Sequence, residues 1–254
     1  MPYDNLAFFL LIFVRITSFF FVLPVFSQNG IPNLVKIGLS VVMSYLIFNG
    51  LSFETEMGHD LVTMFSLCIG ELLIGVTLGF VTLLALTIPR IAMQFIDRQI
   101  GFLMSGVFDP HFGEQVTLMG RFYYLLGVTY FFAINAHHGL IGAFAGSFHV
   151  APVGLLYTIE NLTVLSIVEV FVWSFVFAFQ IALPIIAVLL LTDISMGLIS
   201  KTVPQLHVFI VGLPLKIGAG LLVMFVILPY MGGLFQNIFN QMNTEIINLT
   251  RTFL

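Results

Sequence analysis

Charged side chains at Arg15, Glu71 and Glu169 lie inside long apolar stretches of this sequence. A charge in hydrocarbon is costly, so such a residue usually faces a partner, a cavity or water. One interpretation is a lined conduit or a coupling-ion site. The other is an ion pair, or hydrogen bonds to a neighbouring subunit, that holds an assembly together. We favour the second for Arg15 and Glu71, because a proton relay normally has more acids at mid-depth.

The sequence lacks the common motifs of catalysis. It contains no GxSxG nucleophile turn, no HExxH zinc motif, no GxxxxGK[ST] phosphate loop and no GxGxxG. His137 and His138 are adjacent, so on a helix they point about 100° apart and do not easily share a ligand. Together with His149 they could in principle approach a metal, but a polar patch at a helix break is the simpler interpretation. The single cysteine, Cys68, excludes an internal disulfide. We expect no enzymatic activity and no cofactor.

A polar segment from Asp193 to Lys216 interrupts the apolar C-terminal half and contains two prolines. Residues 170–192 and 217–244, on either side, contain no Asp, Glu, Lys or Arg. About 20 apolar residues suffice to cross a hydrocarbon layer about 30 Å thick. Because hydrocarbon cannot satisfy free backbone groups, we expect this hinge to face water or other protein. The hinge residues expected to make buried contacts in an assembly are Lys201, Gln205 and Lys216.

The composition indicates an integral membrane protein. The chain is 59% hydrophobic and only 8% charged, with a mean hydropathy of +1.11, whereas about a quarter of the residues of a globular domain are charged. Its charges are scattered and sum to −4, so nothing suggests a nucleic-acid partner. The N-terminus carries an acid where a signal peptide has basic residues, and we expect no cleavage. The predicted fold class is all-α, in one helical unit.

The apolar residues cluster into six segments, at 6–26, 34–53, 61–88, 116–151, 162–191 and 206–234. The fourth is too long for one straight span and carries Asn135, His137 and His138 midway, which predicts a broken helix or a hairpin. Turn signals separate the segments, at 27–32, 54–60, 89–114, 152–161 and 193–205.

The basic residues predict an orientation. The second and fourth connections contain no Lys or Arg. By the positive-inside bias, connections one, three and five therefore face the cytoplasm and both termini lie outside. Six of the eight basic residues follow this alternation: Lys36, Arg90, Arg98, Arg121, Lys201 and Lys216.

Glycines punctuate the central segment GFLMSGVFDPHFG, residues 101–113. Bulky Phe and Met on a flexible segment can form a soft, deformable seal, because Met is unbranched and adaptable. A buried turn that packs against its own bundle explains the same residues. These residues alone leave both interpretations open.

Glycines also recur at helical spacing, with Gly75 and Gly79 forming one GxxxG pair and Gly142 and Gly146 another. Such pairs let helix backbones approach closely. We expect tight helix packing at these positions.

Fragments spread along almost the whole chain resemble the FliR family, the export-gate subunit of flagellar type III secretion, and more distantly its SctT counterparts in injectisomes. The matching fragments, in order, are Arg15 with Pro24–Phe26, Gly30–Pro32 with Lys36, Glu71–Gly75 with Gly79–Phe80, Gln99–Pro110, Asn135 with His137, Phe148–Gly154, and Gly197–Lys216. His207 departs from the family's pattern, where a small polar residue is expected.

The resemblance implies a FliP-like portion over about 1–160, with a central loop, fused to a FliQ-like helical hairpin over about 161–254. It implies assembly with FliP-like and FliQ-like gate subunits, attachment of an FlhB-like subunit, and passage of unfolded export substrates. The implied location is the flagellar basal body in the bacterial inner membrane, with much of the assembly above the conventional bilayer plane. The central loop of the family plugs the pore, and here the plug residues would be Phe102, Met104, Gly106, Phe108 and Phe112.

Three functions compete. The leading one is a pore-forming subunit of a flagellar export gate, favoured over injectisome use because the hinge from Lys201 to Lys216 resembles FliR more closely. A secondary transporter would favour paired broken helices in two related halves, and the sequence shows no such pairing. An intramembrane enzyme is disfavoured by the missing catalytic motifs. Purification in mild detergent distinguishes the first two functions. A stable hetero-oligomer supports the export gate, whereas a monodisperse monomer that binds a solute supports a transporter.

Overall fold

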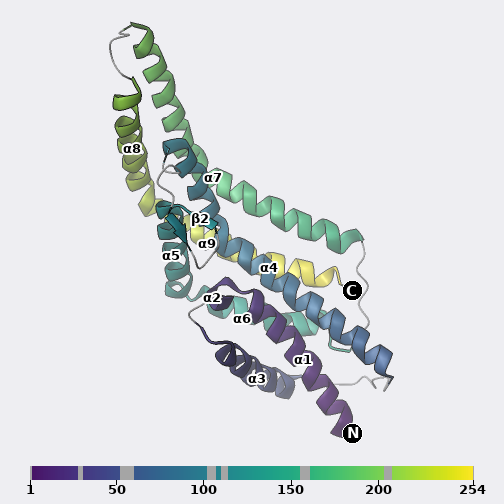
Figure 1. Cartoon of the computed structure of the whole chain (residues 1–254). Coiled ribbons are helices and arrows are strands. Elements are labelled where there is room, and N and C mark those ends of the chain that lie inside the picture. Colours follow the sequence, from purple (N-terminus) through teal and green to yellow (C-terminus); the bar gives the residue numbers. More distant parts are fainter. Residues whose placement is uncertain are drawn as a thin grey trace. The chain divides into compact units, whose positions relative to one another are not determined.

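The protein is helical throughout almost all of its described length, which confirms the predicted all-α class (Figure 1). The structure is a computed structural model that describes residues 2–27, 31–51, 60–101, 107–109, 114–154, 161–202 and 208–253. The helices are α1 (Pro2–Val22), α2 (Pro24–Ser27), α3 (Asn33–Gly50), α4 (Leu61–Ile100), α5 (Leu118–Ala133), α6 (Ala136–Val150), α7 (Asn161–Thr202), α8 (Val208–Ile227), the 3₁₀ turn η2 (Leu228–Tyr230) and α9 (Met231–Arg251).

Helix α4 continues well past the turn that was predicted to begin at Pro89. It runs for 40 residues to Ile100, with Pro89 inside it. The prediction was wrong because a proline does not end a membrane-type helix when neighbouring groups compensate for its lost hydrogen bond. Here Pro89 is buried beneath α5, where a Cβ added at Gly127 would lie 3.3 Å from the proline Cγ.

Helix α7 likewise continues through the first part of the predicted hinge. It spans 42 residues, contains Pro184 and ends at Thr202, so Asp193 and Lys201 are helical. Pro214 also lies inside a helix, α8. The polar hinge is therefore shorter than predicted, and its centre, residues 203–207, lies outside the described part of the chain.

The predicted break in the fourth apolar segment is confirmed. Helix α5 ends at Ala133 and α6 begins at Ala136. Between them, Asn135 has a left-handed φ of 58°, a conformation that asparagine tolerates better than most residues. The resulting helices have 16 and 15 residues, fewer than the roughly 20 needed to cross a bilayer.

A minimal β-hairpin belongs to the described part of the central segment. Strand β1 (Val107–Asp109) pairs antiparallel with β2 (Glu114–Val116), with Val107 opposite Val116. The segment leaves α4 through Gly101, whose φ of +98° favours glycine. The hairpin is short enough that the all-α class still describes the fold.

The chain divides into two compact units that interleave along the sequence. Unit 1 comprises residues 1–85, 135–172 and 239–254, and unit 2 comprises residues 86–134 and 173–238. These units describe contacts within this chain. The division into FliP-like and FliQ-like portions concerns likeness to other proteins and stays a prediction.

In unit 1, α1 lies directly against the N-terminal part of α4. A Cβ added at Gly79 would lie 2.8 Å from the Val22 side chain and 3.1 Å from the Phe19 carbonyl oxygen, and one at Gly75 would collide with Ser18 and with the Arg15 carbonyl. The predicted close approach at this glycine pair is therefore confirmed. At Gly142 and Gly146, in contrast, a Cβ would meet nothing within 4 Å.

In unit 2, α8 and α9 approach their neighbours closely at glycines in the same way. Gly220 on α8 faces Ile100 of α4, with 2.7 Å from an added Cβ to the isoleucine Cδ1. Gly232 at the start of α9 faces the Tyr130 ring on α5. Aromatic contacts add to the packing, among them a T-shaped pair between Phe95 and Phe179 at 5.6 Å.

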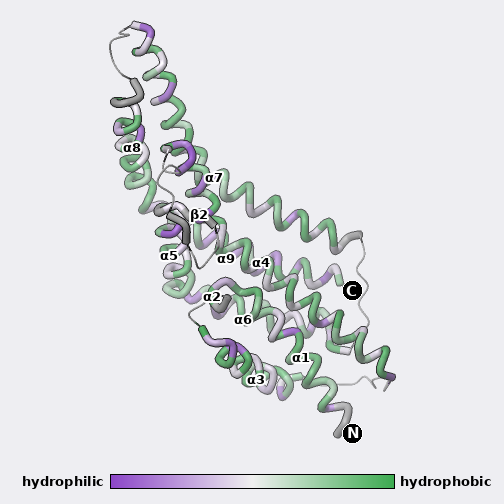
Figure 2. The backbone as a smooth tube through the Cα atoms, viewed as in Figure 1, coloured by the Kyte–Doolittle hydropathy of each residue, from purple (hydrophilic) through white to green (hydrophobic). Residues whose placement is uncertain are grey.

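Much apolar surface remains uncovered. Leu222 and Phe225 on α8 are 65% and 77% exposed, and hydrophobic residues run along most of α4 and α7 (Figure 2). Within the described residues, five segments are long and apolar enough to cross a membrane: Asn5–Val22, Asn33–Gly50, Leu61–Ile100, Thr163–Thr202 and Val211–Arg251. Six had been predicted, and the broken fourth segment accounts for the difference. Exposed faces of this size require lipid or protein cover.

We predict that Gly75→Ala destabilises the protein by about 1–3 kcal/mol, the usual cost of overpacking, because the new methyl group would meet the Arg15 carbonyl and Ser18. Gly38→Ala is the matched control, since Gly38 is exposed on α3 and its added Cβ meets nothing within 4 Å. Thermal unfolding in detergent measures both. Equal unfolding temperatures for the two variants would contradict the close contact of α1 and α4.

Candidate functional site

The Arg15 guanidinium on α1 is a deeply buried charge of unit 1, with 0% of the residue exposed. Its Nε donates a hydrogen bond to the Glu71 carboxylate on α4, and the two form an ion pair. The structure thus brings together the two charges that the sequence had singled out. Their role in assembly stays a prediction.

The remaining guanidinium donors reach the end of α6. Nη2 donates to the Ala151 carbonyl at 3.0 Å and Nη1 to the Ser147 carbonyl at 3.4 Å. The Ser147 carbonyl also accepts a hydrogen bond from the Ala151 N–H at 2.8 Å, and a cation at a helix C-terminus is favourable. The guanidinium carbon also lies 4.3 Å above the centre of the Phe148 ring. Arg15 therefore ties α1 to both α4 and α6.

This polar cluster is suited to holding helices together. Taking two charges out of water costs several kcal/mol each, and only good pairing with further hydrogen bonds offsets that cost. Glu71 supplies the counter-charge, and the backbone N–H of Gly154 lies beside its carboxylate. Removing one partner would leave the other charge buried and uncompensated.

A second polar cluster lies in unit 2, around Asp193 on α7. Its Oδ2 accepts hydrogen bonds from Lys216 Nζ at 2.8 Å and from Gln99 Nε2 at 3.0 Å. The cluster links α7, α8 and the last turn of α4 and is partly exposed. Lys216, predicted to make a buried contact, thus pairs near the surface. Lys201 is exposed, and Gln205 lies outside the described residues.

Asp97 is a buried acid that the sequence analysis overlooked. It is 0% exposed on α4 and faces the Thr117 hydroxyl and the Gly120 backbone N–H without reaching full hydrogen-bond geometry. A negative charge at the N-terminus of α5 is favourable. The misplaced turn hid Asp97, because a residue predicted in a loop is not expected to be buried. The available signal was the spacing of seven residues between Arg90 and Asp97, which places both on the same face if one helix contains them.

The predicted plug residues fall largely outside the described part of the chain. Phe102, Met104, Gly106 and Phe112 belong to the gaps at 102–106 and 110–113. Phe108 is placed by its backbone alone, in β1 opposite Gln115 of β2. Their role as a plug stays a prediction.

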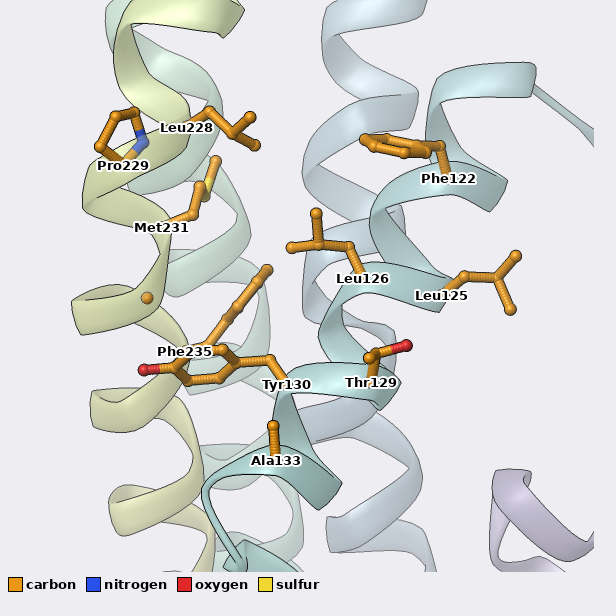
Figure 3. Close-up of a pocket in the computed structure, with 11 residues that line it drawn as sticks. Phe122, Leu125, Leu126, Thr129, Tyr130, Ala133, Leu228, Pro229, Met231 and Phe235 are labelled. Carbon is orange, nitrogen blue, oxygen red and sulfur yellow. The ribbon is translucent and has the colours of Figure 1, made fainter.

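An apolar hollow of about 680 Å³ lies in unit 2 between α5 and the η2–α9 segment (Figure 3). Leu126 and Tyr130 project from α5 toward Met231 and Phe235. The ring centres of Tyr130 and Phe235 lie 5.7 Å apart. No charged side chain lines the hollow. It offers no polar anchors for a cofactor beyond the Thr129 and Tyr130 hydroxyls.

The other chemistry-bearing side chains do not converge on a site. His137 and His138 lie at the start of α6 with ring centres 4.1 Å apart, and Glu169 is exposed on α7. Within the described ranges, no three His, Cys, Asp or Glu residues are grouped as metal ligands.

Known proteins match this chain over most of its length. Residues 6–242 match the family described as bacterial export proteins, family 1. The flagellar biosynthetic protein FliR of Bacillus subtilis (strain 168) is 32% identical over 234 residues, which are 91% of this chain and 90% of that protein. The flagellar biosynthetic protein FliR of Pectobacterium carotovorum subsp. carotovorum is 31% identical over 229 residues, covering 90% and 87%. The surface presentation of antigens protein SpaR of Shigella flexneri is 25% identical over 219 residues, covering 85% and 82%.

Long apolar helices joined by buried polar contacts define a helical protein of membrane type. The chain belongs to the FliR family of bacterial export proteins. The resemblance read from the sequence fragments is thereby confirmed.

We predict that Glu71→Ala destabilises the chain by about 3–5 kcal/mol, because it leaves the Arg15 charge buried without its partner. The yield of assembled complex should fall with it. Asp60→Ala, which removes an exposed acid just before α4, is the matched control and should assemble normally. The readout is complex recovered after co-expression with the partner subunits. Normal assembly of Glu71→Ala with lost export would instead assign Glu71 a coupling role.

Proposed function

We propose that this protein is a non-enzymatic, pore-forming subunit of the flagellar type III export gate. In this role it conducts unfolded flagellar proteins across the bacterial inner membrane, within the flagellar basal body. Its partners are FliP-like and FliQ-like gate subunits and an FlhB-like subunit. The observation that carries the proposal is the match to flagellar biosynthetic proteins along nine-tenths of the chain.

The distribution of polar and apolar groups supports an assembled subunit over a free-standing one. Large apolar side chains on α3, α7 and α8 are uncovered, whereas Arg15 and Glu71 are fully buried. In a chain with this pattern, buried polar contacts hold the helices together, and the apolar faces remain for lipid or neighbouring subunits. Most of these faces belong to helices long enough to span a membrane.

The central segment is the proposed closure of the pore. Phe102, Met104, Phe108 and Phe112 supply apolar bulk, and glycines frame them. A hydrophobic constriction can gate by dewetting without a charged lock. Both ends of this segment are attached to helices by defined features. At its start, Gly101 has a positive φ at the end of α4. At its end, the Thr117 side chain caps α5 by accepting a hydrogen bond from the Gly120 N–H at 3.2 Å.

An injectisome gate is the alternative use of the same subunit. The match to SpaR of Shigella flexneri supports export machinery of this kind, but at 25% identity against 32% and 31% for the flagellar relatives. The flagellar assignment is therefore preferred. Restored secretion of flagellar proteins, measured in a strain that lacks its own FliR, distinguishes the two uses.

We predict that the chain requires partners to be stable. Polar groups buried in hydrocarbon without partners cost several kcal/mol each, and the uncovered apolar faces favour aggregation. Purification in mild detergent should give a stable hetero-oligomer after co-expression with FliP-like and FliQ-like subunits, and little monodisperse protein without them. A well-folded, long-lived monomer that binds a small solute would support a transporter instead.

We also predict that deletion of Ser105–Phe108 leaves the complex assembled but makes the membrane leaky to ions or small solutes. The deletion removes apolar bulk from the proposed plug and spares Gly101 and Thr117 at its ends. Conductance across membranes that hold the assembled variant measures the effect, with the intact complex as the control. A barrier as tight as that of the intact complex would show that the segment is only a turn between helices.

A further inference from the structure

Helix α9 carries an exposed face that is polar and almost uncharged. From Gln236 onward, its exposed residues recur at intervals of three or four, which places them on one side of the helix. Most have amide or hydroxyl side chains, Ile247 is the apolar exception, and Arg251 in the last turn is the one charge. These residues are Gln236, Asn237, Asn240, Thr244, Ile247, Asn248 and Arg251.

The opposite face of α9 is held by the chain itself. Its apolar side chains are at most 2% exposed: Phe235, Ile238, Phe239, Met242, Ile246 and Leu249. An amphipathic helix that lies on a membrane surface places its apolar face in the lipid and carries Lys and Arg on its polar face. Because the apolar face of α9 is already buried and its polar face holds a single Arg, α9 does not fit that role.

The polar face of α9 suits neither hydrocarbon nor bulk water. An amide without a hydrogen-bond partner in hydrocarbon costs several kcal/mol, and the exposed side chains of α8, such as Leu222 and Phe225, are apolar instead. A surface in bulk water usually carries charges of both signs. The one acid of α9, Glu245, lies beside this face and accepts a hydrogen bond from Gln241 Nε2 at 2.6 Å.

The length and chemistry of the face favour a water-filled path. From Gln236 to Arg251 it is about 23 Å long, most of a hydrocarbon thickness of about 30 Å. Each Asn or Gln side chain has two N–H donors and an acceptor oxygen. A packed helix would have to match these groups over four turns, and each buried group left unmatched costs about 1–3 kcal/mol. Water satisfies all of them.

We propose that this face of α9 lines the aqueous path of the export gate and contacts the backbone of the unfolded polypeptide in transit. Amide side chains donate to and accept from peptide groups, which every substrate has whatever its sequence. Between Gln236 and Asn248 the face has no charge, so it neither retains nor repels charged stretches of a substrate strongly. The inference rests on the proposed function and adds to it the surface that meets the substrate.

The first test is photo-crosslinking of the full chain in a strain that lacks its own FliR. A photoreactive phenylalanine analogue replaces Asn240, Thr244 or Asn248, and flagellin with green fluorescent protein fused to its C-terminus occupies the gate. The same analogue at Phe225, which is 77% exposed on the apolar face of α8, is the matched control. The α9 positions should crosslink to flagellin, and the Phe225 position should not.

The outcomes separate the inference from the proposed function. If the wild-type chain restores secretion, but the α9 positions crosslink only to lipid or another subunit, or to nothing, the assignment of this face is wrong and the proposed function stands. If the wild-type chain does not restore secretion, the proposed function is wrong and the inference falls with it.

Charge variants give a second measurement that a merely structural role would not change. Two flagellins that differ only in an acidic or a basic inserted stretch are secreted by the same cells. Asn240→Asp should lower secretion of the acidic one about fivefold relative to the basic one, which corresponds to about 1 kcal/mol, the interaction of two unit charges about 4 Å apart in water. Asn240→Lys should reverse the preference, and Asn240→Gln, the neutral control, should show none. An unchanged ratio in all three variants would overturn the inference.

Discussion

The arrangement of unit 1 depends on the need to neutralise one buried cation. Arg15 lies at the middle of an apolar helix and is fully buried, so its charge requires a partner and its donors require acceptors. Glu71 supplies the charge, and the last carbonyls of α6 supply the acceptors. These requirements specify which face of α4 meets α1 and where α6 ends. Apolar packing alone would allow α1 to rotate or slide, because apolar contacts carry little directional preference.

Helix length imposes a second constraint. The 40 residues of α4 and 42 of α7 correspond to about 60 Å each, twice the thickness of a hydrocarbon core of about 30 Å. Neither helix fits within the hydrocarbon without a steep tilt. The polar cluster of Asp193, Lys216 and Gln99, near one end of both helices, is then compatible with a position outside the hydrocarbon.

The sequence predicted the helices well and their ends poorly. Apolar runs and the break at Asn135 were readable because burial in lipid or protein imposes a simple composition. Pro89 and Pro214 led to wrong helix ends. A proline usually ends a helix in water, but it is tolerated where neighbouring helices satisfy the backbone groups that it frees. The same error concealed Asp97. Arg15 and Glu71 could be selected as charges in apolar runs, but α6 carbonyls as acceptors could not, since backbone atoms leave no signal in residue types.

The two glycine pairs show most clearly what a sequence motif can and cannot specify. Both have the same spacing, and both indicate that a backbone is able to approach. Only the fold reveals that Gly75 and Gly79 are covered by α1, whereas Gly142 and Gly146 are open beside the unpaired Ser147 Oγ. Inside a monomeric protein, an open glycine row would serve no packing purpose, and glycine weakens a helix by roughly 0.5–1 kcal/mol relative to alanine. The spacing of small residues therefore indicates which helix surfaces a backbone is able to approach, and the fold shows which of these surfaces the chain itself covers.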